Sequence, residues 1–353
     1  MAFRFQLIEP FDAGFRRLML EQIERAEHEL SSTGDRAVAV HEMRKSMKRC
    51  RALLRMVRPA IGGKIFHSEN ARFRSAAHHL GGARDQHVIL ETLAKLEASD
   101  DGVNAPIFVK ARKAIADRGD TGVTPEAIAE ALKLLAEGRE ALQEIDFAGE
   151  TGFAVVRDGL EETYRRGRKA FRDAYDHATD EHVHEWRKTV QQHWRQMAAL
   201  EASWPDTMKA RASTARQLSQ LLGDDHDLAV LIAFASGHLE AKTARGLIAL
   251  ARAAQSRIRV EAQPLGSQLY YEKPKALAAR VAHYWNAAER FATAEARAAA
   301  DLQKNSGKAA SGKSGDGKAA DAKSGAGKSA GKISARKSSA GNRRPAGDAV
   351  KAK

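Results

Sequence analysis

The sequence lacks three features that are typical of secreted and membrane proteins: paired cysteines, a long apolar run and a signal peptide. Cys50 is its one cysteine, so no intramolecular disulfide can form and nothing indicates an oxidising compartment. The longest apolar run, around Leu228–Ala235, is far too short to cross a bilayer. The N-terminal residues lack the basic start, apolar middle and cleavage site of a signal peptide. We therefore expect a cytoplasmic protein that makes no membrane contact.

Prolines are few, and those in the first 302 residues fall between segments of helical periodicity. No alternating β-branched run of strand length occurs. The sequence therefore predicts an all-α protein, with a break at Gly81–Gly82 in the third helix and at Gly223 in the eighth. The predicted helices are 12–33, 36–58, 64–98, 107–117, 125–145, 152–177, 180–202, 206–238, 241–262 and 274–302.

Positive charge is concentrated near the C-terminus. The formal net charge is +13, but residues 303–353 alone hold 13 Lys or Arg and 3 Asp, whereas residues 1–302 hold 45 basic and 42 acidic side chains. The C-terminal segment has no aromatic residue and cannot bury enough apolar surface to offset its chain entropy. We expect a helical domain over residues 1–302 and a disordered Lys/Ala/Gly/Ser-rich tail over 303–353.

The first 302 residues contain an internal repeat. VHEMRKSMKRCRALLRMV begins at Val40 and VHEWRKTVQQHWRQMAAL begins at Val183, an offset of 143. A second pair, GGARDQHVIL from Gly81 and GDDHDLAVLI from Gly223, follows at an offset of 142. Two motifs in the same order predict two similar helical halves, about 1–148 and 149–302.

The first repeated helix carries cations along one face. On a helical wheel of about 100° per residue, its basic side chains gather around His41, opposite an apolar face that includes Met43 and Cys50. Glu42 is the only acid from residue 41 to 58, so i,i+4 ion pairs cannot neutralise this face. An anionic partner is indicated, with a solvated or helix-neutralised face as the alternative. The face consists of His41, Arg44, Lys45, Lys48, Arg51 and Arg55.

The second copy of this helix has fewer cations. Gln191 stands where the first copy has Lys48, while Arg187, Lys188 and Arg195 lie beside His184. We therefore expect an asymmetric anion site that is richer in the first half. At a helix N-terminus, a neutral imidazole can either cap the helix or bond a ligand oxygen, and both roles stay open for the two histidines. The preceding helix adds charge through Arg165, Arg166, Arg168, Lys169 and Arg172.

These motifs resemble the CHAD family, the conserved-histidine α-helical domain. Val40–Arg51 is similar to the family's first helix motif and Gly81–Leu90 to its arginine-aspartate element, while His184–Trp194 and Leu221–Leu231 resemble the second-half motifs. The resemblance spans residues 3–300. It implies two pseudo-symmetric antiparallel bundles of four main helices each. It also implies binding of inorganic polyphosphate between the halves, in some members at polyphosphate granules.

The predicted polyphosphate site combines this resemblance with the basic helix faces. The resemblance supports His41, Arg44, Lys45, Lys48, Arg49, Arg51, Arg55, Arg84, His184, Arg187, Lys188 and His226. The helix faces add Arg165, Arg166, Lys169 and Arg195.

Three other functions stay open. A phosphohistidine relay would need a nucleotide site, but no G-x-x-x-x-G-K-[ST] loop is present, so we expect no enzyme, no catalytic residue and no cofactor. His182-x-His184 and the aspartates of Asp224–Asp227 include metal-ligand types, yet positions i and i+2 point to different sides of a helix. The aspartates favour a helix cap over a metal site, and divalent cations are expected only as counterions of polyphosphate. The tail resembles histone-like arms, so non-specific DNA binding is the main alternative.

Overall fold

The computed structural model describes residues 3–80, 82–117 and 122–311, with the backbone alone for 82–85 and 304–311. Within these residues the chain forms eleven α-helices, one short 3-10 helix (Glu201–Ser203) and no strand, which confirms the all-α prediction. The α-helices are α1 (Phe11–Ser31), α2 (Arg36–Ile61), α3 (Gly63–His79), α4 (Gly82–Ala98), α5 (Ala105–Ala116), α6 (Pro125–Ala141), α7 (Ala154–His177), α8 (Asp180–Ala199), α9 (Pro205–His238), α10 (Ala241–Leu269) and α11 (Pro274–Ser311).

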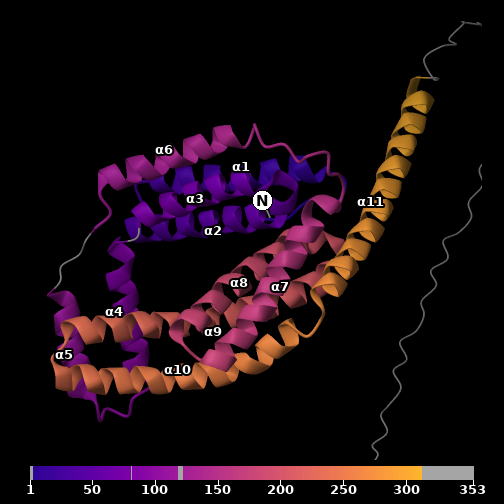
Figure 1. The fold of residues 1–353 in the computed structure, drawn as a ribbon. Helices are drawn as coiled ribbons and strands as arrows, with labels where there is room; N and C mark the ends of the chain where they lie inside the picture. Colours follow the sequence, from indigo (N-terminus) through magenta and orange to yellow (C-terminus); the bar gives the residue numbers. More distant parts are fainter. Residues whose placement is uncertain (1–2, 81, 118–121, 312–353) are drawn as a thin grey trace, which may run out of the picture. The chain divides into compact units, whose positions relative to one another are not determined.

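The helices of the compact unit Met1–Ala300 form two bundles that meet at α2. In the first, α1, α2, α3 and α6 lie side by side around buried Leu18, Met47 and Phe73 (Figure 1). In the second, α7, α8, α9 and the C-terminal part of α10 enclose Trp186 and Leu218. Because α2 also packs on α7 and α8, one continuous apolar core joins the two bundles.

α4 leaves the first bundle and packs, together with α5, on the ends of α9 and α10 (Figure 1). A separate apolar core forms there, which includes Leu93, Phe108, Leu231 and Leu247. At the repeat offsets of 143 and 142, α1 corresponds to α7, α2 to α8, α3 with α4 to α9, and α5 to α10, while α6 falls across the end of α10 and the start of α11. The halves therefore differ in that the first has a break between α3 and α4 where α9 is continuous.

The predicted break at residues 81–82 is present, because α3 ends at His79 and α4 begins at Gly82. The predicted break at Gly223 is wrong, since α9 runs without interruption from Pro205 to His238. A helical glycine costs only about 1 kcal/mol relative to alanine. Leu222 and Leu228 are buried on either side of Gly223, so packing holds the helix together there.

Prolines begin several helices as predicted, but two of them do not separate helices. Pro205 and Pro274 are the first residues of α9 and α11. Pro59 lies inside α2 and Pro264 inside α10, so the predicted ends at 58 and 262 are too early. An interior proline costs about 3 kcal/mol in an isolated helix. Burial of the flanking turns offsets this cost, as at Ala262, which is fully buried.

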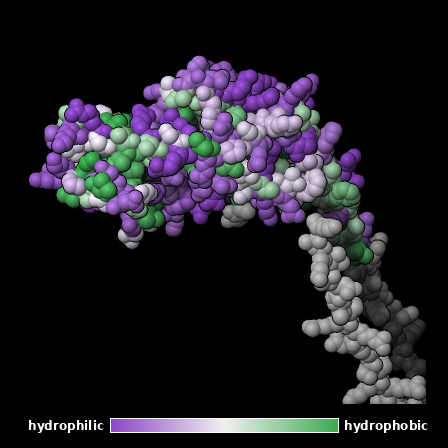
Figure 2. Space-filling view, turned by 90° about the horizontal axis from the view of Figure 1, so that it is seen from below, coloured by the Kyte–Doolittle hydropathy of each residue, from purple (hydrophilic) through white to green (hydrophobic). Residues whose placement is uncertain are grey.

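α11 extends to Ser311, past the predicted helix end at 302. The rest of the predicted tail, residues 312–353, lies outside the described residues. Among the helices that the structure describes, none combines the length and apolarity needed to span a bilayer. Figure 2 shows a largely hydrophilic face, on which hydrophobic residues gather mainly over the end that carries α4, α5 and the neighbouring parts of α9 and α10.

A close helix crossing fixes how the two bundles meet. A Cβ atom on Gly159 of α7 would lie 1.9 Å from the carbonyl oxygen of Met56 on α2, so only glycine permits this approach. Beside the crossing, Gln196 of α8 donates from Nε2 to Thr163 Oγ1 (3.1 Å) and to the Ala52 carbonyl (3.4 Å). These contacts set α2 and α8 so that their basic sides border the same space.

Candidate functional site

A cavity of about 400 Å³ lies between α2, α4, α8 and α9. Burial of Met43 and Cys50 on α2, and of Val183 and Met197 on α8, turns the basic side of each helix away from the core. Eight predicted site residues line this space, which we call the cation cavity. They are Arg44, Lys48, Arg51, His184, Arg187, Lys188, Arg195 and His226.

The described walls of the cation cavity contain little opposite charge. Six of the lining residues are Lys or Arg, whereas Asp227 is the one acid among them. The remaining lining residues are Val88, Gln191, Gln192 and Val230. Such an imbalance favours an anion in the cavity.

Two arginines of α2 are anchored by neighbouring groups of α3. Arg44 donates from Nη1 to the Ala77 carbonyl (2.7 Å), and Arg51 donates from Nε to Asn70 Oδ1 (3.0 Å). Burial lowers the pKa of Arg51, with Arg74 adding a repulsive charge. These neutral acceptors orient the guanidinium groups without cancelling their charge.

Arg195 is the lining cation with the least solvent exposure, at 7%. Its Nη1 donates to the Gln191 carbonyl (2.6 Å), and its guanidinium lies 4.3 Å from the centroid of the Trp194 ring. Burial lowers the pKa of Arg195 to about 9, with Arg49 and Arg187 adding repulsion. Its Nε is buried with no hydrogen-bond partner among the described residues. None of the described carboxylates forms an ion pair with Arg51 or Arg195.

His184 and His226 stack on each other in the cavity wall, with ring centroids 4.2 Å apart and an interplanar angle of 26°. Nδ1 of His184 is buried and has no hydrogen-bond partner in the described part of the chain. Burial lowers the pKa of both imidazoles, that of His226 to about 4. Both rings are therefore neutral near pH 7.

Gly223 of α9 lies beside the guanidinium of Arg187. A Cβ atom at position 223 would lie 3.6 Å from an Nη atom of Arg187, which is ordinary van der Waals contact, so the packing of α8 on α9 does not require glycine here.

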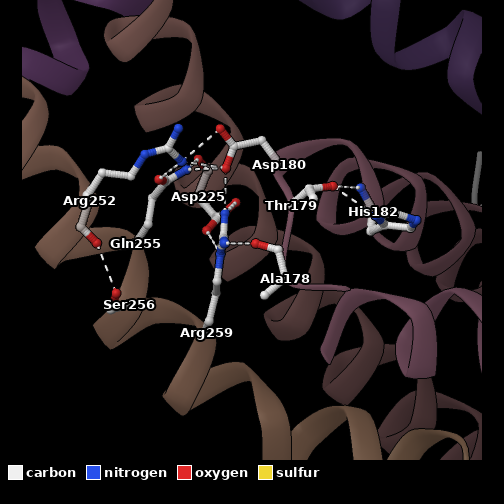
Figure 3. Close-up of polar contacts among 9 residues, drawn as sticks. All are labelled: Ala178, Thr179, Asp180, His182, Asp225, Arg252, Gln255, Ser256 and Arg259. Carbon is white, nitrogen blue, oxygen red and sulfur yellow. Dashed lines mark hydrogen bonds and ion pairs between the residues drawn. The ribbon is translucent and has the colours of Figure 1, made fainter. Parts of the chain in front are cut away.

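Ion pairs at Asp225, the residue before His226 in the sequence, hold α9 against α8 and α10 (Figure 3). Arg259 donates to both carboxylate oxygens of buried Asp225 (2.7 and 3.3 Å), to Asp180 (2.7 Å) and to the Ala178 carbonyl (2.9 Å). Gln255 donates to the Asp225 carbonyl (3.0 Å). The aspartates of 224–227 thus lie inside a continuous helix, and the prediction that they cap a helix is wrong.

Three predicted cations of α2 lie outside the cavity lining. Lys45 pairs with Glu42 (2.6 Å) on its own helix. Arg49 donates to Gln22 Oε1 of α1 (3.0 Å). Arg55 lies over the ring of Phe66 (4.8 Å to the centroid). Burial, reinforced by Arg166, lowers the pKa of Arg55 to about 10.

The other predicted residues are distributed around these positions. Arg165 pairs with Glu161 and Lys169 with Asp173 along the exposed side of α7, and Arg166 is exposed on the same helix. His41 lines a neighbouring cavity of about 790 Å³, which shares Val88 with the cation cavity. The side chain of Arg84 lies outside the described residues.

A metal site is not formed by the described side chains. No group of three or more His, Cys, Asp or Glu residues is placed to hold a metal ion in the searched part of the chain. His182, one of the histidines with ligand-like spacing, instead has Nδ1 2.8 Å from Thr179 Oγ1. The chemistry of the cavity is therefore that of cations and neutral imidazoles.

The lining residues that sequence reasoning left out of the site are the uncharged ones and Asp227. Val88 and Val230 occupy matched positions of the repeat, at an offset of 142. This match could have identified the two valines as site residues, because both recur with the basic motif in the sequence and both line the cation cavity. Gln191 and Gln192 were noticed only as missing charges, yet both line the cavity.

Comparison with known proteins identifies the family of this chain. A search of the curated proteins finds no match. The family model of the CHAD domain matches residues 16–236, a range that includes every residue lining the cation cavity. Because this match covers more than half of the chain, the protein belongs to the CHAD family.

Proposed function

We propose that the cation cavity binds inorganic polyphosphate. CHAD domains are associated with polyphosphate binding in general. The observation that carries the proposal for this chain is Arg195, a buried guanidinium at the cavity wall that has an unbonded Nε and no carboxylate ion pair among the described residues. Such a group is costly unless an anion completes its environment.

Polyphosphate suits these walls because it presents charge and oxygen acceptors at every repeat and has no base to be recognised. Arginine can donate to two phosphate oxygens at once, while lysine acts as a mobile point charge. Arg44, Arg51 and Arg187 supply the first kind of contact, and Lys48 and Lys188 the second. Arg55 of α2 and the exposed Arg166 of α7, which acts electrostatically on it, offer further positive charge along which a longer chain can continue.

DNA is the competing polyanion. A duplex requires a broad basic surface, and single strands are usually held by stacking of bases on aromatic rings. The described lining of the cation cavity contains no Phe, Tyr or Trp side chain. These features favour a thin, unstacked polyanion in the cavity, with any DNA contact made through the Lys-rich tail.

CHAD domains are generally binding domains. We propose that this chain likewise binds polyphosphate without cleaving or forming it, and that it is directed in this way to polyphosphate granules. The tail would add a second, unselective grip that raises avidity. Phosphate release, or phosphohistidine formed with ATP or polyphosphate, would contradict the non-enzymatic part of this proposal.

The decisive experiment is a competition between two polymers of matched charge. Long-chain polyphosphate and duplex DNA are titrated against the full chain and against a chain ending at Ser311. We expect the shortened chain to keep its preference for polyphosphate. Arg51→Gln and Arg195→Gln should each weaken that binding about tenfold or more, since a hydrogen bond to a charged group contributes about 1.5–3 kcal/mol. Arg157→Gln removes an exposed arginine of α7 and should leave binding unchanged. Preference for DNA, or binding of neither polymer, refutes the proposal.

A further inference from the structure

The stacked histidine pair is the part of the cavity wall whose charge could change near neutral pH if a bound anion favoured the protonated form. His184 comes from α8 and His226 from α9, and their rings lie 4.2 Å apart. Both residues line the cation cavity, and the buried Nδ1 of His184 has no hydrogen-bond partner within the described part of the chain. A proton on this pair would therefore be in the wall that faces a bound anion.

Burial is the main reason why the pair is neutral when the cavity holds no anion, and the charged groups around it add to this effect. On α8, Arg187 and Lys188 repel a proton from both rings, and Glu185, which pairs with Lys188, opposes this only partly. Asp180 is the carboxylate that favours a charged His226, but it is already bound to Arg252 and Arg259. The other charged groups lining the same cavity are Arg44, Lys48 and Arg51 of α2, Arg195 of α8, and Asp227 of α9, while α4 contributes only the apolar Val88.

We propose that polyphosphate entering the cation cavity draws a proton onto the His184–His226 pair, so that the cavity holds polyphosphate more tightly as the medium becomes more acidic. This inference rests on the proposed function and adds to it a regulation of the same site. Phosphate oxygens beside the pair supply both a negative charge and an acceptor for an imidazole N–H. An opposite charge at such a distance favours the protonated imidazole.

The size of the effect follows from proton linkage. Two protonated imidazoles at 4.2 Å would repel each other, so we expect the pair to take up one proton, not two. A site that gains a full proton on binding gains a factor of about ten in affinity for each pH unit. Because uptake is partial near the ends of the range, the dissociation constant should fall roughly three- to thirtyfold between about pH 7.5 and about pH 5.5.

The test measures protons directly. Long-chain polyphosphate is titrated into the full chain by calorimetry at one pH in two buffers of different ionisation enthalpy, and the difference in heat gives the protons taken up. The tail has no histidine, so its contacts do not titrate in this range. We expect uptake by the native chain, its loss in the double variant His184→Gln/His226→Gln, and its retention in His283→Gln, which removes an exposed histidine of α11.

Each outcome separates this inference from the proposed function. Polyphosphate binding without proton uptake overturns the inference and leaves the function standing, whereas absence of binding overturns both. Uptake that persists in a folded double variant assigns the proton to other groups and also overturns the inference. If thermal melting shows that the double variant does not fold, NMR titration of the two imidazoles in the native chain decides: their pKa values must rise when polyphosphate is added, and unchanged values refute the coupling.

Discussion

Arg195→Met is expected to stabilise the protein while weakening its binding of polyphosphate. The substitution replaces a buried guanidinium by an unbranched apolar side chain that can occupy much of the same space. It removes the bond to the Gln191 carbonyl and the contact with the Trp194 ring, both of which are made by residues of α8 itself. The fold therefore does not depend on Arg195 to join two helices.

The magnitude follows from the pKa of this guanidinium. Burial lowers it from 12.5 to about 9, which corresponds to roughly 5 kcal/mol against the charged form in the folded protein. The hydrogen bond and the ring contact offset part of this, at about 1 kcal/mol each. Replacing a buried charge by a packed apolar side chain is often stabilising by about 1–4 kcal/mol, and we expect a gain at the lower end of that range.

The assay combines thermal unfolding without ligand and titration with polyphosphate. For a compact unit of about 300 residues, a gain of 1 kcal/mol raises Tm by only about 1.5–2 °C, so the assay must resolve a rise of roughly two degrees. Affinity for polyphosphate should fall about tenfold or more in the same variant. Arg157→Met, at a half-exposed arginine paired with Asp158, should change neither quantity much. A less stable Arg195→Met variant with unchanged affinity would refute the reasoning.

Three further predictions concern stability. The buried imidazole of His193 has a pKa well below its ordinary value because of burial, so the unfolded chain binds a proton that the folded chain does not. The free energy of unfolding should therefore fall as the pH drops below about 6.5, and this group contributes at most about 1.4 kcal/mol per pH unit. Urea unfolding midpoints that do not move between about pH 7 and about pH 5 would contradict this prediction. Arg259→Ala leaves the carboxylate of Asp225 buried without its main partner and should lower the free energy of unfolding by about 3–5 kcal/mol in chemical denaturation. Arg259→Lys keeps the positive charge and should lower it less, so equal losses in the two variants would argue against a charge effect. Gly159→Ala forces a Cβ into the backbone of α2 and should cost at least about 2 kcal/mol, whereas Gly237→Ala meets open space and should be neutral or stabilising; similar Tm values for the two would show that the crossing is looser than described.

Helix periodicity was sufficient to predict most of the fold. The starts of α6, α9 and α11 follow from prolines that suit the first turn of a helix, and the stop before α4 follows from paired glycines. The errors at Pro264 and Gly223 have one cause. Whether a weak position ends a helix depends on the packing of the turns on either side, and that packing comes from residues far away in the sequence. The departure of α4 and α5 from the first bundle also depends on packing against distant residues, because these helices share an apolar core with α9 and α10.

The candidate site was predictable where one helix decides it. The wheel of α2 placed Arg44, Lys48 and Arg51 on one side, and these three line the cavity together. The cations of α7 carried a contrary signal in the sequence, because Glu161 and Asp173 stand at i,i+4 spacing from Arg165 and Lys169 and pair with them. The depth of Arg195 and the stacking of the histidines could not be predicted, since each depends on how α8 meets α2 and α9.

The two halves contribute to one cavity partly through matched residues, such as Arg44 and Arg187, and partly through different ones, and a shared cavity can explain this divergence. At an offset of 143, Lys48 and Arg51 correspond to Gln191 and Trp194, while Arg195 corresponds to buried Ala52. If each half bound its own anion, the loss of two cations from α8 would abolish the second site. Because α2 and α8 border the same space, a cation one residue later on α8 still reaches it, and Trp194 supports that cation through its ring. Selection on such a cavity acts on the sum of its charges, so the repeat can lose its internal symmetry while the site keeps its excess of positive charge.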